Sequence, residues 1–455
     1  MTLLLLAIFV IAEAAFAVFE FTAADRKGKW KLKRLSVNAI ELVLFLIMLI
    51  LPGIDLSFRF TGLVAMLLIR LVIAGIFYLA GRKNDKPKKR PAMIVGALAH
   101  IVLISVAMAP AFIFIDYGDR PVSGGFTPVE TSAILTDTSR LEAFENDGSF
   151  REIPVHIFYP EETGSIQNGS LPLVFFSHGA FGWYQSNMSA YRELASNGYV
   201  VVSLDHPYHA FFTKDTTGKL ITVDPEFMQN ALYIGNEDID ATETVDIYST
   251  EQEWIKLRTA DMNYAIDAFK AACSGNYDGW TIPDGGSEKV SSALALIDTD
   301  RIGLMGHSLG GATAVTVGRR DDISAVIDID GTMLGEQIGF EDGKYIINEE
   351  PYTTPLLCID NDEHHDMSAE LRETGYAYAN NVVLDNAENA YRTYFKGAKH
   401  MDLTDLPLIS PFIASMLGSG DVDVEYCSKT MNGIMVDFFD CYLKGEGTFS
   451  VNESY

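Results

Sequence analysis

Ser308 has the clearest setting for nucleophilic chemistry in this sequence. It stands in the segment 306–311 (GHSLGG), which follows a short apolar run and precedes a run of small residues. A G-x-S-x-G pattern between a strand and a helix is typical of a sharp turn that exposes the serine hydroxyl, because the glycines let the backbone pack tightly. The same letters also occur in glycine-rich loops that merely begin a helix. The strand–turn–helix setting favours the catalytic interpretation.

A serine hydroxyl becomes a nucleophile when a base accepts its proton, and an acid commonly orients that base. His400 lies just after the last candidate strand, residues 391–395, where a base is expected. His364 and His365 precede that strand and are poorer candidates. We therefore predict that His400 is the base.

Three aspartates lie between the serine and the histidine, which is the chain order that such a site requires. Asp330 follows the apolar run 325–329, whereas Asp360 and Asp362 follow the next run, 355–359. Both strand ends are compatible with the acid. The spacing alone therefore leaves all three open.

An attacked carbonyl oxygen becomes negatively charged and needs backbone N–H donors. One donor is expected from the residue after the nucleophile, Leu309, and the other from the loop after an earlier strand. That strand, residues 171–177, runs into His178-Gly179-Ala180, and we assign the second donor to Ala180. The alternative for this loop is a tight turn with a core histidine.

No cofactor or metal is expected. The nine histidines and four cysteines show no metal-ligand spacing, and no cysteine falls in a C-x-x-C pair. Cys427 and Cys441 are close enough in sequence to form a disulfide in an extracellular domain. Two isolated buried thiols are an equally good alternative.

Short apolar runs alternate with amphipathic segments after a joint near residues 121–128 that is rich in Pro and Gly. Such runs are typical of strands buried on both faces of a parallel sheet. The alternation predicts a doubly wound, mostly parallel α/β sheet over residues 120–455. The expected strands are 150–159, 171–177, 199–204, 301–305, 325–329, 355–359 and 391–395, and the expected helices are 191–196, 251–272, 311–318 and 430–442.

An insertion at residues 207–252 is rich in aromatic and acidic side chains. It is expected above the strand ends, where it would form a lid or an acyl-binding wall. The alternative is a solvated excursion without a catalytic role. The side chains that suggest the lid are Tyr208, Phe211, Phe212, Phe227, Tyr233, Asp238 and Asp240.

The first 119 residues have a different character. Four apolar stretches, residues 2–21, 35–51, 60–80 and 92–115, come near the ~20 residues that a helix needs to cross a membrane, although the second is marginal at its ends. A signal peptide would need a basic segment before the first stretch, and the sequence has none there. Residues 1–119 are therefore predicted to form an all-α bundle of four transmembrane helices.

The charges divide in the same way. Residues 1–119 hold 14 Lys and Arg against 8 Asp and Glu, whereas the remainder holds 20 against 53. The two regions are expected to face different surroundings, and the acidic one should repel nucleic acid.

Basic residues cluster in two loops, 26–34 and 82–90, while the loop between the second and third stretches holds only Arg59. The positive-inside rule then puts both basic loops in the cytoplasm. This predicts a multi-pass protein of the cell membrane with its catalytic domain on the extracellular face. Glu13, Arg70 and His100 lie inside the stretches. Glu13 and Arg70 are at similar depth and would pair, or each would contact backbone and water instead.

Six segments resemble those of platelet-activating-factor acetylhydrolases and their bacterial relatives. The motifs FFSHGAFGW, SLDHPYHA, GHSLGG, DIDGTM, PLLCIDND and YFKGAKHMDL occur in the order seen in that family, over about residues 127–445. The resemblance implies an α/β-hydrolase fold and Asp330 as the acid. It also implies hydrolysis of short or oxidised acyl chains from phospholipid-like esters, without calcium or another cofactor. The N-terminal stretches, and Ala180 with Trp183-Tyr184 in the pocket wall, depart from the family.

The predicted function is that of a membrane-anchored serine esterase with Ser308, His400 and Asp330 as its triad. Its partner would be a small-molecule or lipid ester, and the sequence leaves the oligomeric state open. Alternatives on the same triad are a peptidase, an acyltransferase, or a polyester- or cutinase-like hydrolase. A catalytically idle receptor ectodomain is the alternative from another class.

Overall fold

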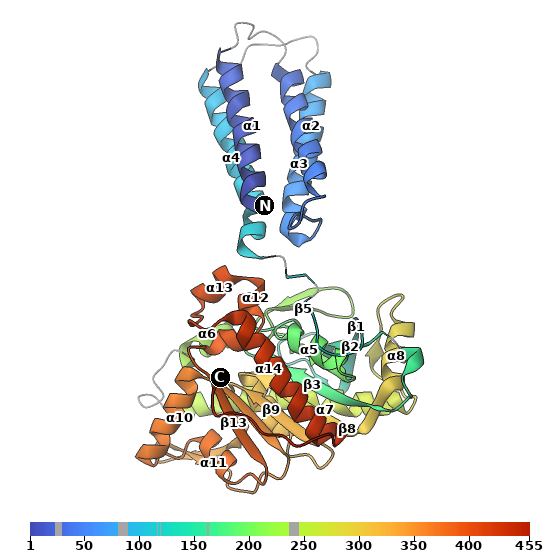
Figure 1. Cartoon of the computed structure of the whole chain (residues 1–455), viewed down its shortest axis with the longest axis vertical. Helices are drawn as coiled ribbons and strands as arrows, with labels where there is room; N and C mark the ends of the chain where they lie inside the picture. Colours follow the sequence, from blue (N-terminus) through green and yellow to red (C-terminus); the bar gives the residue numbers. More distant parts are fainter. Residues whose placement is uncertain (23–29, 81–89, 116, 119, 162, 236–244) are drawn as a thin grey trace. The chain divides into compact units, whose positions relative to one another are not determined.

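The computed structural model describes the chain except for residues 23–29, 81–89, 116, 119, 162 and 236–244 (Figure 1). The predicted lid residues Asp238 and Asp240, residues 26–29 of the first basic loop and residues 82–89 of the second therefore lie outside the described residues. The chain divides into two compact units. One is Met1–Gly118 with Leu408–Ile413, and the other is Asp119–Pro407 with Ala414–Tyr455.

The N-terminal unit contains the four expected helices. Three of them are long and apolar enough to cross a membrane, whereas the second is not. The second helix is shorter and more polar, since it carries Lys31, Lys33 and Arg34 near its start and Glu41 in its middle. The helices are α1 (Thr2–Thr22), α2 (Trp30–Met48), α3 (Phe58–Ala80) and α4 (Arg90–Ile113).

Charged side chains of the bundle face its interior. The fully buried Glu13 lies 2.7 Å from Arg34 and also pairs with Arg70. Arg70 lies 3.0 Å from Glu41, which is buried as well. The predicted pairing of Glu13 with Arg70 is thus confirmed. His100 instead bonds to its own helix, with Nδ1 2.6 Å from the carbonyl oxygen of Gly96.

The second unit is built on a mixed sheet of nine strands within the described residues. Its order is β13-β12-β9-β8-β3-β4-β2-β1-β7. Neighbours from β13 to β4 are parallel, and the pairs that follow are antiparallel. The strands are β1 (Pro128–Leu141), β2 (Phe150–Pro160), β3 (Leu171–Ser177), β4 (Val200–Leu204), β7 (Trp280–Thr281), β8 (Ile297–His307), β9 (Ala325–Ile329), β12 (Leu356–Asn361) and β13 (Ala390–Phe395).

Helices cover both faces of this sheet (Figure 1). On β3, Leu173 and Phe175 pack with one helical layer, and Val174 and Phe176 pack with the other. This alternation follows from the pleat, which turns successive side chains to opposite faces. The first layer has α7 (Val245–Cys273), α8 (Ser287–Leu296) and α9 (Leu309–Val317), and the second has α5 (Met188–Ser196) and α14 (Val424–Phe439). The predicted doubly wound α/β-hydrolase fold is confirmed.

Shorter elements occupy the connections between these strands and helices. The hairpin β5–β6 and helix α6 fall within the predicted insertion, whereas α7 begins at Val245, earlier than expected. The insertion therefore has secondary structure of its own. These elements are β5 (Phe212–Lys214), β6 (Leu220–Thr222), α6 (Pro225–Ile234), β10 (Gln337–Glu341), β11 (Lys344–Ile347), α10 (Asp362–Thr374), α11 (Ala379–Asp385), α12 (Leu406–Ile409) and α13 (Pro411–Met416).

Candidate active site

Ser308 lies at the turn between β8 and α9, in a strained backbone conformation. Its φ is 56°, in the left-handed region that non-glycine residues rarely adopt, and its N–H donates to the carbonyl oxygen of Ile329 at 2.8 Å. A Cβ at Gly306 would lie 2.1 Å from the oxygen of Gly310, and one at Gly310 would lie 1.9 Å from the oxygen of Ser177. Only glycine fits at either position, so the two glycines of the G-x-S-x-G pattern allow the backbone to form this turn.

His400 lies beside this turn. It begins the short 3-10 helix η3 (His400–Leu403), soon after β13. The preceding neighbour of Ser308, His307, donates from Nε2 to the carbonyl oxygen of His400 at 3.1 Å, and the two rings lie 4.5 Å apart. Burial lowers the pKa of His307 to about 3, so that ring stays neutral. The side chain of His400 is 44% exposed and accessible to a substrate.

The carboxylate of Asp330 bonds to the Nδ1 side of the His400 ring. Its Oδ2 lies 2.5 Å from His400 Nδ1, and its Oδ1 lies 3.0 Å from His364 Nδ1. Asn361 donates its backbone N–H to Oδ1 at 2.9 Å and its side-chain amide to Oδ2 at 2.5 Å. Burial raises the pKa of Asp330, but the hydrogen bonds from His364 and His400 outweigh it and hold the pKa well below the usual value. The carboxyl group is therefore ionised.

The other two aspartates have different partners. Asp360 pairs with Arg392, whose Nε lies 2.5 Å from Oδ2. Asp362 accepts the N–H of Gly397 at 3.0 Å. Of the three candidates, Asp330 is the one that contacts His400.

The two backbone N–H groups that the sequence predicts as oxyanion donors belong to Ala180 and Leu309. Among the residues that the structure describes, the backbone N–H groups of Ala180 and Leu309 donate no hydrogen bond. Leu309 is the first residue of α9, and the first N–H groups of a helix have no partner within it. Next to Ala180, Phe181 has a φ of 60° and donates to the oxygen of His209 at 3.1 Å.

Arg258, which sequence reasoning missed, holds this loop from below. It is fully buried on α7 and donates to the carbonyl oxygens of His178 and, at 3.3 Å, Gly179. Its Nε lies 3.2 Å from Nδ1 of His209. Burial lowers the pKa of Arg258 to about 9, so it stays charged at neutral pH. Nothing in the spacing of helix 251–272 distinguished this arginine from a surface residue.

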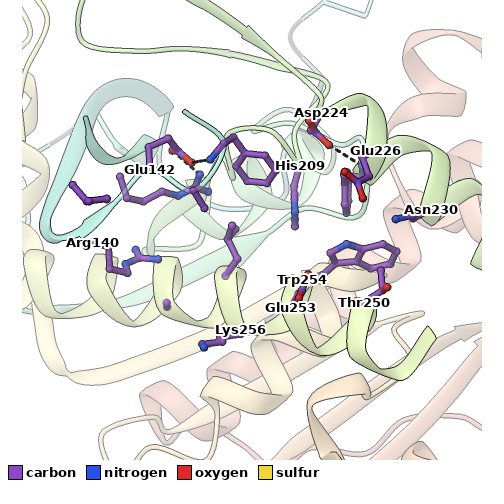
Figure 2. A pocket seen from close by; sticks show the side chains of 17 residues that line it. Arg140, Glu142, His209, Asp224, Glu226, Asn230, Thr250, Glu253, Trp254 and Lys256 are labelled. Atoms are coloured by element: carbon purple, nitrogen blue, oxygen red, sulfur yellow. Dashed lines mark hydrogen bonds and ion pairs between the residues drawn. The ribbon is translucent and has the colours of Figure 1, made fainter. Parts of the chain in front are cut away.

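A cavity of about 650 Å³ opens between the segment 140–144, α6 and α7. His209 and Trp254 line it, as Figure 2 shows, together with Phe227. Phe227 and Trp254 also pack in one apolar cluster with Leu309 and Ala180. Within the described residues, neither Ser308, Asp330 and His400 nor the loop 178–182 lines the cavity, so the cavity is linked to the candidate site through this apolar cluster.

The remaining sequence expectations concern thiols and metals. Cys427 and Cys441 are both free thiols, which agrees with the alternative of isolated cysteines. Asp330, Asp360 and His364 place ligand atoms within 4.8 Å of one another, the spacing of a possible metal site. Those atoms already bond to one another and to Asn361, His400 and Arg392, so the group is held together without an ion.

A family model described as platelet-activating factor acetylhydrolase, isoform II, matches residues 155–453. A comparison with curated proteins found no match. Among solved structures, the chain is similar to a ferulic acid esterase from Streptomyces cinnamoneus, with 17% sequence identity and a TM-score of 0.49. That match covers 72% of this chain and 94% of the other. The family match spans more than half of the chain and includes Asp330, His400 and the turn at residues 306–311 around Ser308, here called the elbow. The chain therefore belongs to the platelet-activating-factor acetylhydrolase isoform II family of ester hydrolases.

Proposed function

We propose that this protein is a serine esterase in which Ser308 forms an acyl-enzyme. His400 accepts the proton of the serine hydroxyl as Oγ attacks the ester carbonyl, and then donates it to the departing alcohol. Asp330 keeps the imidazole in the tautomer whose Nε2 is free to accept. The hydrogen bond between Asp330 and His400, next to the strained elbow, is the observation that carries the proposal. Water then attacks the acyl-enzyme by the same steps in reverse.

The tetrahedral intermediate carries its negative charge on the former carbonyl oxygen. The free N–H groups of Ala180 and Leu309 are the proposed donors to that oxygen. A positive helix end at Leu309 favours the same charge. Arg258 supports the loop that carries Ala180.

The proposed substrate is a phospholipid-like ester with a short or oxidised acyl chain. The description of the family names an acetylhydrolase, which is the main support for a short acyl group. Phe181, Phe227 and Trp254 supply an apolar wall beside the oxyanion loop, against which an acyl chain would pack. We assign the lid function to the hairpin β5–β6 and helix α6 in the insertion.

Labelling and turnover test the reaction. The full-length protein in detergent should react stoichiometrically with a fluorophosphonate probe and hydrolyse p-nitrophenyl esters, preferring about two to six acyl carbons. Ser308→Ala should lose both, leaving at most the residual catalysis of about 10³–10⁴ over water that binding and an oxyanion hole provide. The exposed Ser274 gives the control, because Ser274→Ala should behave as wild type. A folded wild type that is neither labelled nor active on any ester would leave the idle receptor as the better proposal.

We also propose that the bundle anchors the esterase in the cell membrane with the catalytic unit outside. The support for anchoring is the three helices of sufficient length and apolarity, and the support for the orientation is the two basic loops. This orientation requires the shorter helix α2 to cross the membrane as well, because only then do both basic loops lie on one side. In intact cells a membrane-impermeant maleimide should label a cysteine added at the C-terminus but not Trp30→Cys, and the wild-type chain gives the background. If Trp30→Cys is labelled and the C-terminal cysteine is not, the orientation is the opposite of the proposed one.

A further inference from the structure

Two histidines, not one, bond to the carboxylate of Asp330. His400 approaches Oδ2 at 2.5 Å, and His364 approaches Oδ1 at 3.0 Å. His400 is half exposed at the site, whereas His364 is buried in the first turn of α10. An orienting acid needs only one histidine to act on the nucleophile. The second histidine therefore has a different task.

The ring of His364 is held on several sides. Its Nε2 lies 2.7 Å from the hydroxyl of Tyr378, and its Nδ1 lies 3.6 Å from Asp360 as well as 3.0 Å from Asp330. Its backbone N–H donates to the side chain of Asn361 at 2.8 Å, and Asn361 in turn donates to Asp330. His364, Asn361 and Asp330 thus form one hydrogen-bonded unit that fixes the carboxylate.

The buried charges around this unit balance only when His364 is protonated. Asp330 and Asp360 are buried anions, and Arg392 pairs with Asp360. Burial and the charge of Asp360 raise the pKa of the nearby Asp328 well above its usual value, which favours the neutral form of Asp328. One buried negative charge therefore lacks a cation unless His364 is protonated, and an uncompensated buried charge is costly.

The protonation state of His364 follows from the same neighbours. Burial lowers the pKa of this imidazole, but Tyr378, Asp360 and Asp330 outweigh burial and raise the pKa well above the usual value. As an imidazolium, His364 donates from both ring nitrogens: Nδ1 to Asp330 and Nε2 to the oxygen of Tyr378. Beyond Asp330 the next titratable rings are those of His400 and the neutral His307.

We propose that His364 is a positioning residue of the triad, which holds Asp330 through Oδ1 and, as a cation, offsets part of the negative charge that Asp330 presents to His400. A weaker negative charge stabilises protonated His400 less. His400 is then neutral, and able to accept the proton of Ser308, at a lower pH than it would be if Asp330 had no bond to His364. The inference rests on the proposed roles of Asp330 and His400.

Three variants separate the two parts of this role. His364→Asn keeps a donor at the position of Nδ1 but removes the charge. His364→Phe removes both the donor and the charge. His365→Asn is the matched control, because the adjacent His365 stacks on Tyr394 instead of bonding to Asp330.

The measurement is the pH profile of kcat/KM on a short p-nitrophenyl ester, with the full-length protein in detergent and circular dichroism as the check of folding. His364→Asn should move the acid limb up by about one pH unit, the low end of the effect of one nearby charge, and keep the plateau within about threefold. His364→Phe should shift the limb equally and also lower kcat about 10- to 100-fold with little change in KM. His365→Asn should match the wild type.

An unshifted acid limb in folded His364→Asn would overturn the charge role, and wild-type kcat in folded His364→Phe would overturn the positioning role. If neither variant folds, Tyr378→Phe decides. It removes the acceptor of Nε2, together with a longer contact to Thr332 at 3.4 Å, and should shift the limb in the same direction by less, whereas an unshifted limb would overturn the charge role. Activity that a chelator abolishes would also overturn the proposal, in favour of a metal ion bound by Asp330, Asp360 and His364. If the wild type has no esterase activity, the proposed function itself fails. This result differs from the outcomes above, because each of them requires an active wild type.

Discussion

The two units of this protein put their apolar side chains in opposite places. In the bundle Ile11, Val72 and Val106 are more than half exposed, while Glu13 and Glu41 are fully buried. In the hydrolase unit, apolar residues of the sheet are buried between two helical layers. Burial of apolar surface drives folding where the surroundings are water, and that driving force is absent in lipid. The contrast supports different surroundings for the two units.

Both units nevertheless bury a compact ionic group. In the bundle Glu13 and Glu41 pair with Arg34 and Arg70, and these four residues come from the three helices α1, α2 and α3. In the hydrolase unit, the group contains Asp330, Asp360, Arg392 and, in our proposal, charged His364. Among the described residues, the printed ion pairs of the first group join α1, α2 and α3, whereas the second group has the half-exposed His400 at one edge. This difference agrees with our proposal, in which the first group stabilises the bundle and the second takes part in ester hydrolysis.

The largest expected effect is on the chemical group. Asp330→Asn should lower kcat about 10⁴-fold, because an amide cannot hold His400 in the tautomer that accepts the proton of Ser308. Asp362→Asn is the control and should cost little, since Asp362 bonds to the backbone of Gly397. Steady-state kinetics on folded variants checks both. A severe loss of kcat in Asp362→Asn with a mild loss in Asp330→Asn would show that the acid is Asp362 and that its assignment to Asp330 is wrong.

The bundle group should affect stability instead of rate. Arg70→Leu leaves Glu13 and Glu41 without one of their cations, and removing one partner from a buried pair costs about 3–5 kcal/mol. Unfolding of the full-length protein in mixed micelles, followed by helical circular dichroism, measures the loss. The kcat of the folded variant should equal that of the wild type. A large fall in kcat without loss of stability would mean that the two ionic groups are not separate in function.

A substitution of the buried Arg258 should lower kcat through the loop 178–180, which Arg258 binds. Arg258→Met removes the donors to His178 and Gly179, so Ala180 should lose its fixed position. The expected fall in kcat is up to about 10²–10³-fold, the effect of losing one oxyanion donor. KM should change much less. If kcat and stability are both unchanged, the loop is held by its other contacts, such as the hydrogen bond from Phe181 to His209.

The smallest effect is expected at the surface. Arg372 and Asp385 form an ion pair at 2.7 Å, but their side chains are 49% and 58% exposed. Arg372→Ala should cost about 0.2–1 kcal/mol, with less effect at high salt, because water screens the pair. Thermal unfolding at low and high salt measures this. A loss comparable to that of Arg70→Leu would show that exposure does not separate structural from incidental ion pairs in this chain.

Much of the fold could be predicted because it follows from local pattern. The runs at 171–177 and 325–329 become β3 and β9 with the predicted bounds, since all but one of the side chains in each run are apolar. The antiparallel strand β1 was missed because its sequence mixes apolar with polar residues such as Glu130 and Asp137. The helix at 251–272 was placed correctly, but its start was not, because α7 continues into the aromatic and acidic insertion.

The sequence by itself determined the elbow around Ser308, the candidate base His400 and the apolar helices, because each depends on residues that are neighbours along the chain. Only the tertiary structure showed which aspartate contacts His400. The strand of Asp360, β12, lies next to β13, but Asp360 pairs with Arg392 of β13, and it is Asp330 at the end of the farther strand β9 that bonds to His400. The roles of Arg258 and His364 were equally hidden. Their partners lie 80 and 34 positions away in the chain, and only folding brings them within hydrogen-bonding distance.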